Sequence, residues 1–162
     1  MKKLETLLKN YEDHVAERAS QGIPPLPLNA EQTNCITQLL EQKTNYKSKY
    51  LIDLLENRVP PGVDEAAYVK ASWLTAIVNG EKNCKFINPH KAIQILGTMI
   101  GGYNVNSLIE ILKSKNILLA KEAAQVLKNI ILVYDAANDI FDLSKNNIYA
   151  QEVVNSWANA EW

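Results

Sequence analysis

The chain has 162 residues, which is the size of one domain with a single substantial core. Its 47% hydrophobic and 22% charged residues exclude a disordered chain, and no run of about 18 apolar residues indicates a membrane span. The net charge is −1, from 17 basic and 18 acidic residues, and no segment is basic enough to predict a nucleic-acid surface. The first residues contain no apolar stretch of signal-peptide length, so we expect a cytoplasmic protein.

The first part of the chain is predicted to contain two helices joined by a proline-rich connector. Apolar residues spaced by three and four over 4–19 mark one face of the first helix, which ends at Gly22. The connector, 23–28, contains three prolines and is expected to lie extended against the domain. Asn29 then starts the second helix as an N-cap, and Gln32 completes the pattern of a capping box.

A helix end and a helix start stand next to each other near the middle of the chain. The helix that runs through Leu54 must end before Pro60, because proline lacks the backbone donor of the helical ladder. Asp64 then supplies an N-cap oxygen and a negative charge to the next helix. We expect Gly62 to serve the geometry of this turn and not chemistry, with stability lost on substitution if its backbone is left-handed.

The later helices are predicted from the same spacing of apolar residues. Trp73 is expected in the core, and Tyr68 is expected to widen the buried face of the same helix. Asn88 and Asn104 are candidate caps of the next two helices. A longer helix that begins around Leu118 is expected to turn Ile131 inward, and two short helices complete the chain.

No segment alternates with period two for long enough to indicate a strand, so we predict an all-α protein of about eight or nine helices. Helix pairs near 30–57, 64–97 and 105–133 recur at the spacing of two-helix repeats. That spacing agrees with a short stack of antiparallel helix pairs. A plain helical bundle is the alternative that the pattern leaves open.

The chain contains few residues suited to metal or nucleophilic chemistry. Its two histidines and two cysteines, at positions 14, 35, 84 and 90, form no His-Glu-x-x-His or Cys-x-x-Cys motif. Cys35 is expected to be a small buried hydrophobe, and His14 a solvated side chain. The glycines at 97, 101 and 102 follow no predicted strand, which argues against a phosphate-binding loop. We assign no catalytic, cofactor-binding or metal-binding residue.

Acidic residues near the C-terminus form one further candidate. Asp135, Asp139 and Asp142 fall near one helical face and could hold a divalent cation together with Glu152. Their spacing lacks the glycine and the closely spaced oxygen ligands of a calcium loop, so a solvated acidic surface is the simpler interpretation.

Four stretches resemble, in the same order, the N-terminal HEAT-like domain of bacterial aconitase B (aconitate hydratase B / 2-methylisocitrate dehydratase). They are His14–Ala19, Asn57–Ala71, Leu96–Asn104 and Ser156–Trp162. The resemblance implies that 1–162 is a single HEAT-like domain, either the first domain of a longer multidomain enzyme or an excised part of one.

The resemblance also implies what the parent enzyme does. That family isomerises citrate and isocitrate through cis-aconitate in the tricarboxylic acid cycle, on a 4Fe-4S cluster held by three cysteines. This chain has two cysteines, so the cluster ligands are expected outside it and the chain alone is expected to be non-catalytic.

The partners implied by the resemblance are the remaining domains of the parent enzyme, a second copy in a homodimer and other metabolic enzymes. The domain is also expected to shape access to the active site. RNA binding, which the family suggests for its cluster-free form, is only weakly supported by the balanced charge. A free-standing helical interaction module is the alternative. Trp157 and Trp162 are the candidate interface residues, unless they fold back onto their own domain.

Overall fold

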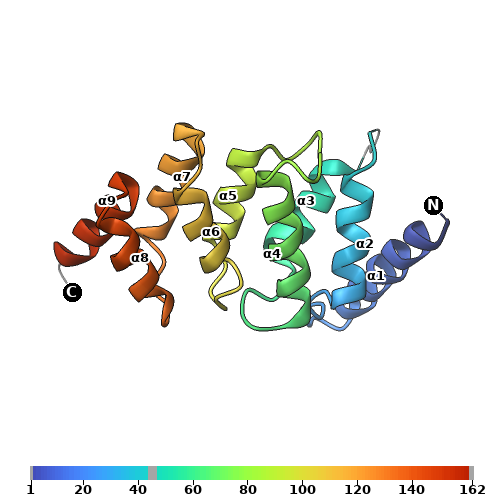
Figure 1. The fold of residues 1–162 in the computed structure, drawn as a ribbon. Helices are drawn as coiled ribbons and strands as arrows, with labels where there is room; N and C mark the ends of the chain where they lie inside the picture. Colours follow the sequence, from blue (N-terminus) through green and yellow to red (C-terminus); the bar gives the residue numbers. More distant parts are fainter. Residues whose placement is uncertain (1, 44–46, 161–162) are drawn as a thin grey trace.

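The computed structural model describes residues 2–43 and 47–160, which form nine α-helices and no strand (Figure 1). The all-α prediction and the expected number of helices are confirmed. None of the helices in this part of the chain is long and apolar enough to cross a membrane. The helices are α1 (Lys2–Ser20), α2 (Ala30–Leu40), α3 (Ser48–Asn57), α4 (Glu65–Val78), α5 (Pro89–Gly97), α6 (Val105–Leu112), α7 (Ile117–Leu127), α8 (Ala136–Ser144) and α9 (Ile148–Ala158).

The helices stack as consecutive pairs. α2 packs on α3, α4 on α5, α6 on α7 and α8 on α9, while α1 lies against α2. Successive pairs meet through α2 against α4, α5 against α7 and α7 against α9. The stack is elongated in Figure 1, with α1 at one end and α9 at the other. Each pair therefore buries apolar surface against the next, as the family resemblance implies, and the arrangement is a stack and not a plain bundle.

Side-chain caps begin the helices at the predicted positions. The Asn29 side chain accepts a hydrogen bond from the backbone N–H of Gln32 at 2.8 Å, and the Gln32 side chain accepts one from the Asn29 N–H at 3.0 Å. The Asp64 side chain caps α4 by accepting a hydrogen bond from the Ala66 N–H, and the Asn88 side chain caps α5 by accepting one from the Lys91 N–H, each at 2.8 Å. Each such cap stabilises its helix by about 1 kcal/mol.

Asn104 stands at the start of α6 but does not cap it. Its buried side chain instead donates hydrogen bonds to the carbonyls of Leu96, at 2.7 Å, and Met99, at 3.1 Å. The prediction of a cap is therefore wrong. Asn104 thus adds side-chain hydrogen bonds to carbonyl groups at the end of α5 and just after it.

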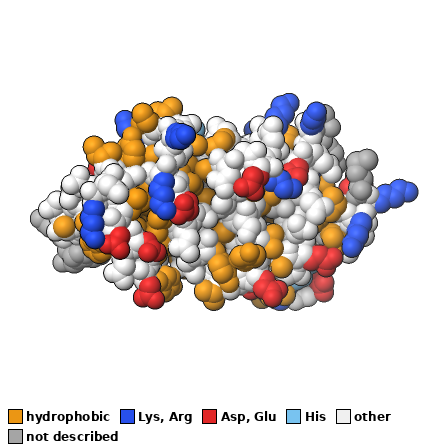
Figure 2. Space-filling model, viewed as in Figure 1, with side chains coloured by type: hydrophobic (Ala, Val, Ile, Leu, Met, Phe, Trp, Pro, Cys, Tyr) orange, Lys and Arg blue, Asp and Glu red, His pale blue; other side chains and the backbone are white. Residues whose placement is uncertain are grey.

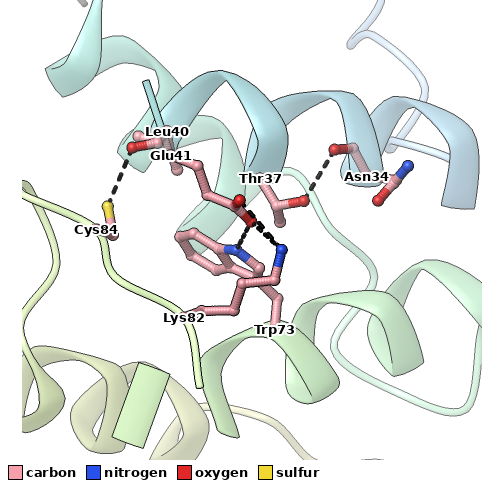
Figure 3. Close-up of polar contacts among 7 residues, drawn as sticks. All are labelled: Asn34, Thr37, Leu40, Glu41, Trp73, Lys82 and Cys84. Atoms are coloured by element: carbon pink, nitrogen blue, oxygen red, sulfur yellow. Dashed lines mark hydrogen bonds and ion pairs between the residues drawn. The ribbon is translucent and has the colours of Figure 1, made fainter. Parts of the chain in front are cut away.

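Trp73 lies in the core with 6% of its surface exposed, as predicted. Its Nε1 donates to Oε1 of Glu41 at 2.9 Å, and Nζ of Lys82 lies 2.9 Å from the same oxygen. Figure 3 shows the indole nitrogen and the ammonium group both directed at this carboxylate, where the end of α2 meets α4. Cys84 donates from its thiol to the carbonyl of Leu40 at 3.3 Å. These contacts hold the end of α2 against α4 and the segment after α4.

Two residues predicted to face the core are exposed. Tyr68 is 59% exposed, because the buried face of α4 runs through Lys70, Ala71 and Leu74 instead. Ile131 is 82% exposed, because α7 ends at Leu127 and its helical spacing does not extend that far.

The proline-rich connector is held by side chains from α1 and by Arg58. Nε2 of His14 accepts a hydrogen bond from the backbone N–H of Leu26 at 3.0 Å, and the Tyr11 hydroxyl donates to the Leu26 carbonyl at 3.1 Å. Nη2 of Arg58 donates to the Pro25 carbonyl at 2.6 Å. His14 is therefore a structural contact of the connector, and the prediction of a solvated side chain is wrong.

The loop before α4 touches the loop before α6. The backbone N–H groups of Ile100 and Gly101 both donate to the Pro61 carbonyl, at 2.9 and 3.2 Å. Gly62 is not in the left-handed region, and a Cβ atom there would meet open space. The loss of stability predicted for a left-handed Gly62 is therefore not expected on substitution. Gly101 is the glycine that this crossing requires, since a Cβ atom on it would overlap the backbone of Gly62.

Candidate functional site

The two cysteines do not fit the ligand set of an iron–sulfur cluster. Both are buried, and the Cys35 thiol donates to the Leu4 carbonyl at 3.2 Å. Burial raises the pKa of the Cys35 thiol, and nearby Glu31 adds to the effect. A cluster ligand must be a thiolate, whereas this environment favours the protonated thiol.

The acidic residues of the C-terminal part are divided among different contacts. Asp142 forms an ion pair with Lys145 at 2.7 Å, and Glu152 lies 3.4 Å from Lys128, the residue that follows α7. No group of three or more His, Cys, Asp and Glu within 2–43 and 47–160 is placed to hold a metal ion.

Lys70 is a buried charged residue that the sequence reading missed. It is 2% exposed, and its Nζ lies 3.4 Å from the carbonyl oxygen of Glu56. Burial lowers the pKa of the Lys70 ammonium to about 8, although the Glu56 carboxylate opposes that shift. Its spacing from Ala67 and Leu74, which place it on the apolar stripe of α4, is the signal that could have found it.

Trp157 is partly buried and packs against the edge of Phe141 with the ring centroids 6.3 Å apart. The contact joins α9 to α8 and leaves Phe141 substantially exposed. Trp162, the other candidate interface residue, lies outside the described residues. Interface roles for both tryptophans remain predictions.

Exposed apolar side chains of the two crossing loops, of the first turn of α4 and of the segment between α7 and α8 form a group that we call the loop patch. The rings of Tyr68 and Tyr103 pack edge to face with centroids 5.4 Å apart, and the Tyr103 hydroxyl donates to the Val63 carbonyl at 3.1 Å. Ile100 is joined to the first loop through Pro61, and a Cβ atom on Gly102 would lie 3.5 Å from the ring of Tyr134. The loop patch consists of Val63, Tyr68, Ile100, Tyr103 and Tyr134.

Figure 2 shows hydrophobic side chains along the lower edge of the molecule, on the side where these loops lie in Figure 1, and a second group of them at the upper left. Sequence reasoning did not assemble the loop patch, because its tyrosines come from three separate segments and no local spacing relates them.

The chain matches the family described as the aconitate B N-terminal domain over residues 10–162. It is 53% identical over 156 residues to aconitate hydratase B of Synechocystis sp., covering 96% of this chain and 18% of the relative. It is 48% identical over 157 residues to the same enzyme of Escherichia coli, with the same coverage. The Helicobacter pylori enzyme is 45% identical over 159 residues, or 98% of this chain and 18% of the relative.

The chain thus spans about a fifth of the length of the curated relatives it matches. The match includes all four stretches that carried the sequence resemblance, at a level of identity well above that needed to establish common descent. The chain belongs to the aconitate B N-terminal domain family.

Proposed function

We propose that residues 1–162 are a single non-catalytic domain of an aconitate hydratase B-type enzyme, and that the domain acts through contacts with the remaining domains. The observation that carries the proposal is the match along nearly the whole chain to only 18% of each relative's length. The rest of such a polypeptide would hold the catalytic apparatus. Dimerisation and control of access to the active site are finer roles within the same proposal.

In this proposal the reaction takes place on the remaining domains and not on this chain. The relatives are named for the hydration of aconitate, and the resemblance implies a 4Fe-4S cluster that supplies a Lewis-acidic iron when bound. Both thiols of this chain donate to backbone carbonyls, which supports the proposal that the cluster ligands lie outside this chain. In this proposal the chain positions and covers the catalytic domains and makes no contact with reacting atoms.

Cluster reconstitution tests this division. The purified chain is treated with iron and sulfide, and its visible absorbance and its conversion of citrate to aconitate are measured. The separately produced remainder of the parent polypeptide serves as the positive control. We expect a cluster and turnover in the remainder and neither in this chain. Turnover or a stable cluster in the chain alone would overturn the proposal.

A further inference from the structure

We propose that the loop patch is the surface on which this domain docks against the remaining domains of its own polypeptide. The complementary surface would be apolar at its centre and would carry Lys or Arg at its edge. This inference rests on the proposed function, because it names the face that makes the contact proposed there.

The composition of the loop patch fits a protein interface. Its five residues are between 39% and 74% exposed, although all five are hydrophobic and three of them are tyrosines. Scattered apolar residues are normal on a surface, but adjoining ones from separate segments mark interaction sites. Tyrosine is enriched at such interfaces, because it buries a large ring and keeps a polar tip.

The loop patch is held in one arrangement before any partner binds. The Pro61 carbonyl accepts two backbone hydrogen bonds from the second loop, and Tyr103 bonds back to the first. Gly101 allows the two backbones to meet without a side chain between them. A surface that is already ordered loses little conformational entropy on binding, which favours affinity.

The backbone conformation of Tyr134 is a second indication that the loop patch is a binding surface. Its φ of 50° places a bulky residue in the left-handed region, which is unfavourable for side chains other than glycine. That backbone conformation sets the ring beside Gly102 while leaving 60% of the residue exposed. Strained residues of this kind are found at binding sites, where the position of the side chain matters more than local stability.

The charge around the loop patch selects the chemistry of the partner. Basic residues flank the segments that build the patch, but Lys70 is buried, and Lys113 and Lys145 form ion pairs with Glu110 and Asp142. The carboxylates nearest the patch residues in the sequence belong to Asp64, Glu65 and Asp135. Asp64 and Glu65 follow Val63, and Asp135 follows Tyr134. An acidic edge attracts a basic protein surface and repels the phosphates of RNA. Two copies of the chain would bring acidic edges together, which disfavours a symmetric contact through this face.

A surface depression beside the patch suggests where a basic side chain would bind. It has a volume of ≈ 480 Å³ and is lined in part by Gly102, Tyr134, Asp135 and Asp139. An Arg or Lys entering it would meet the tyrosine ring and two carboxylates, a favourable setting for a cation. The remaining four fifths of the relatives' length supply the candidate occupant, since most of such a polypeptide lies outside the matched region.

Isothermal titration calorimetry tests the assignment. The purified chain is titrated with the separately produced remainder of the parent polypeptide, and the double variant Tyr68→Ser/Ile100→Ser is compared with wild type. The matched control is Leu118→Ser/Ile148→Ser, because both residues are 64% exposed and lie on α7 and α9, away from the loops. Circular dichroism and thermal melting establish that each variant is folded.

We expect the patch variant to bind at least about tenfold more weakly than wild type and the control to bind within about twofold. Asp135→Lys should weaken binding as well, and the wild-type affinity should fall as salt is raised. Equal binding by the patch variant and wild type would overturn the docking assignment and leave the proposed function standing. Absence of wild-type binding would overturn both. Self-association or RNA binding by wild type that disappears in the patch variant would overturn the assignment, because it would show that a second copy or RNA binds this surface.

Discussion

Gly101 lies so close to Gly62 that a Cβ atom on Gly101 would overlap the carbonyl group of Gly62. A side chain at Gly101 must push apart two loops that share the Pro61 carbonyl. We therefore expect Gly101→Ala to lower the free energy of unfolding by about 2 kcal/mol or more. Chemical denaturation with circular dichroism measures this quantity.

Gly62→Ala is the matched control, because a Cβ atom there would meet open space and the backbone is not left-handed. It should leave the free energy of unfolding unchanged or raise it by up to about 1 kcal/mol, through reduced freedom of the unfolded chain. The reverse order of the two effects would show that the loops do not meet as described.

Lys70 should make stability depend on pH. The pKa of its ammonium is about 8 in the folded chain and 10.5 when unperturbed, so the unfolded state binds more protons between these values. The free energy of unfolding should then rise as pH increases from about 8 towards 10.5. Denaturation at several pH values measures the slope, and the exposed Lys85 offers the comparison Lys85→Met, which should retain it.

Replacing the buried charge should itself stabilise the fold. Lys70→Met keeps a side chain of similar length in an apolar site without an ammonium group to desolvate. We expect a gain of about 2 kcal/mol at neutral pH and loss of the pH dependence above pH 8. A loss of stability with an unchanged pH profile would indicate that Lys70 makes a net favourable contact.

Tyr134→Gly should relieve backbone strain. Glycine adopts a φ of 50° at no steric cost, whereas Tyr134→Ala removes the ring and keeps the strain. The glycine variant should exceed the alanine variant in free energy of unfolding by about 1 kcal/mol. Thermal melts of the two proteins give the difference directly, and equal values would show that the left-handed conformation carries no penalty here.

Substitution of the two C-terminal tryptophans should have different effects on stability and on association with the other domains. Trp157→Ala removes a ring pair with Phe141 and should cost about 1 kcal/mol. Trp162→Ala should change stability by no more than about 0.5 kcal/mol while weakening association with the other domains. Sedimentation of the variants with the rest of the parent polypeptide distinguishes the two effects. A large loss of stability with unchanged association would reject the interface role of Trp162.

Local chemistry made much of the fold predictable from the sequence. Asn29, Asp64 and Asn88 act as caps because the interaction is confined to one helix turn, and the helical class followed from the spacing of apolar residues. The prediction for Tyr68 was wrong and the burial of Lys70 was missed, because the buried face of α4 depends on which helices pack against it.

The loop patch was beyond sequence reasoning for a similar reason. No spacing within one segment relates Tyr103 to Val63, which is 40 residues away in the sequence. The two residues meet only because their loops cross where Gly101 approaches Gly62. The hydrogen bond from the Asn104 side chain to the Leu96 carbonyl also depends on tertiary packing, because the side chain reaches back to the preceding helix.

Contact between this domain and the rest of an aconitate hydratase B-type polypeptide is tested most directly by sedimentation velocity. The wild-type chain and the separately produced remainder are run alone and as an equimolar mixture. We predict a faster-sedimenting species in the mixture that contains both polypeptides. Two boundaries identical to those of the separate components, at concentrations where both are folded, would contradict the role proposed for this domain.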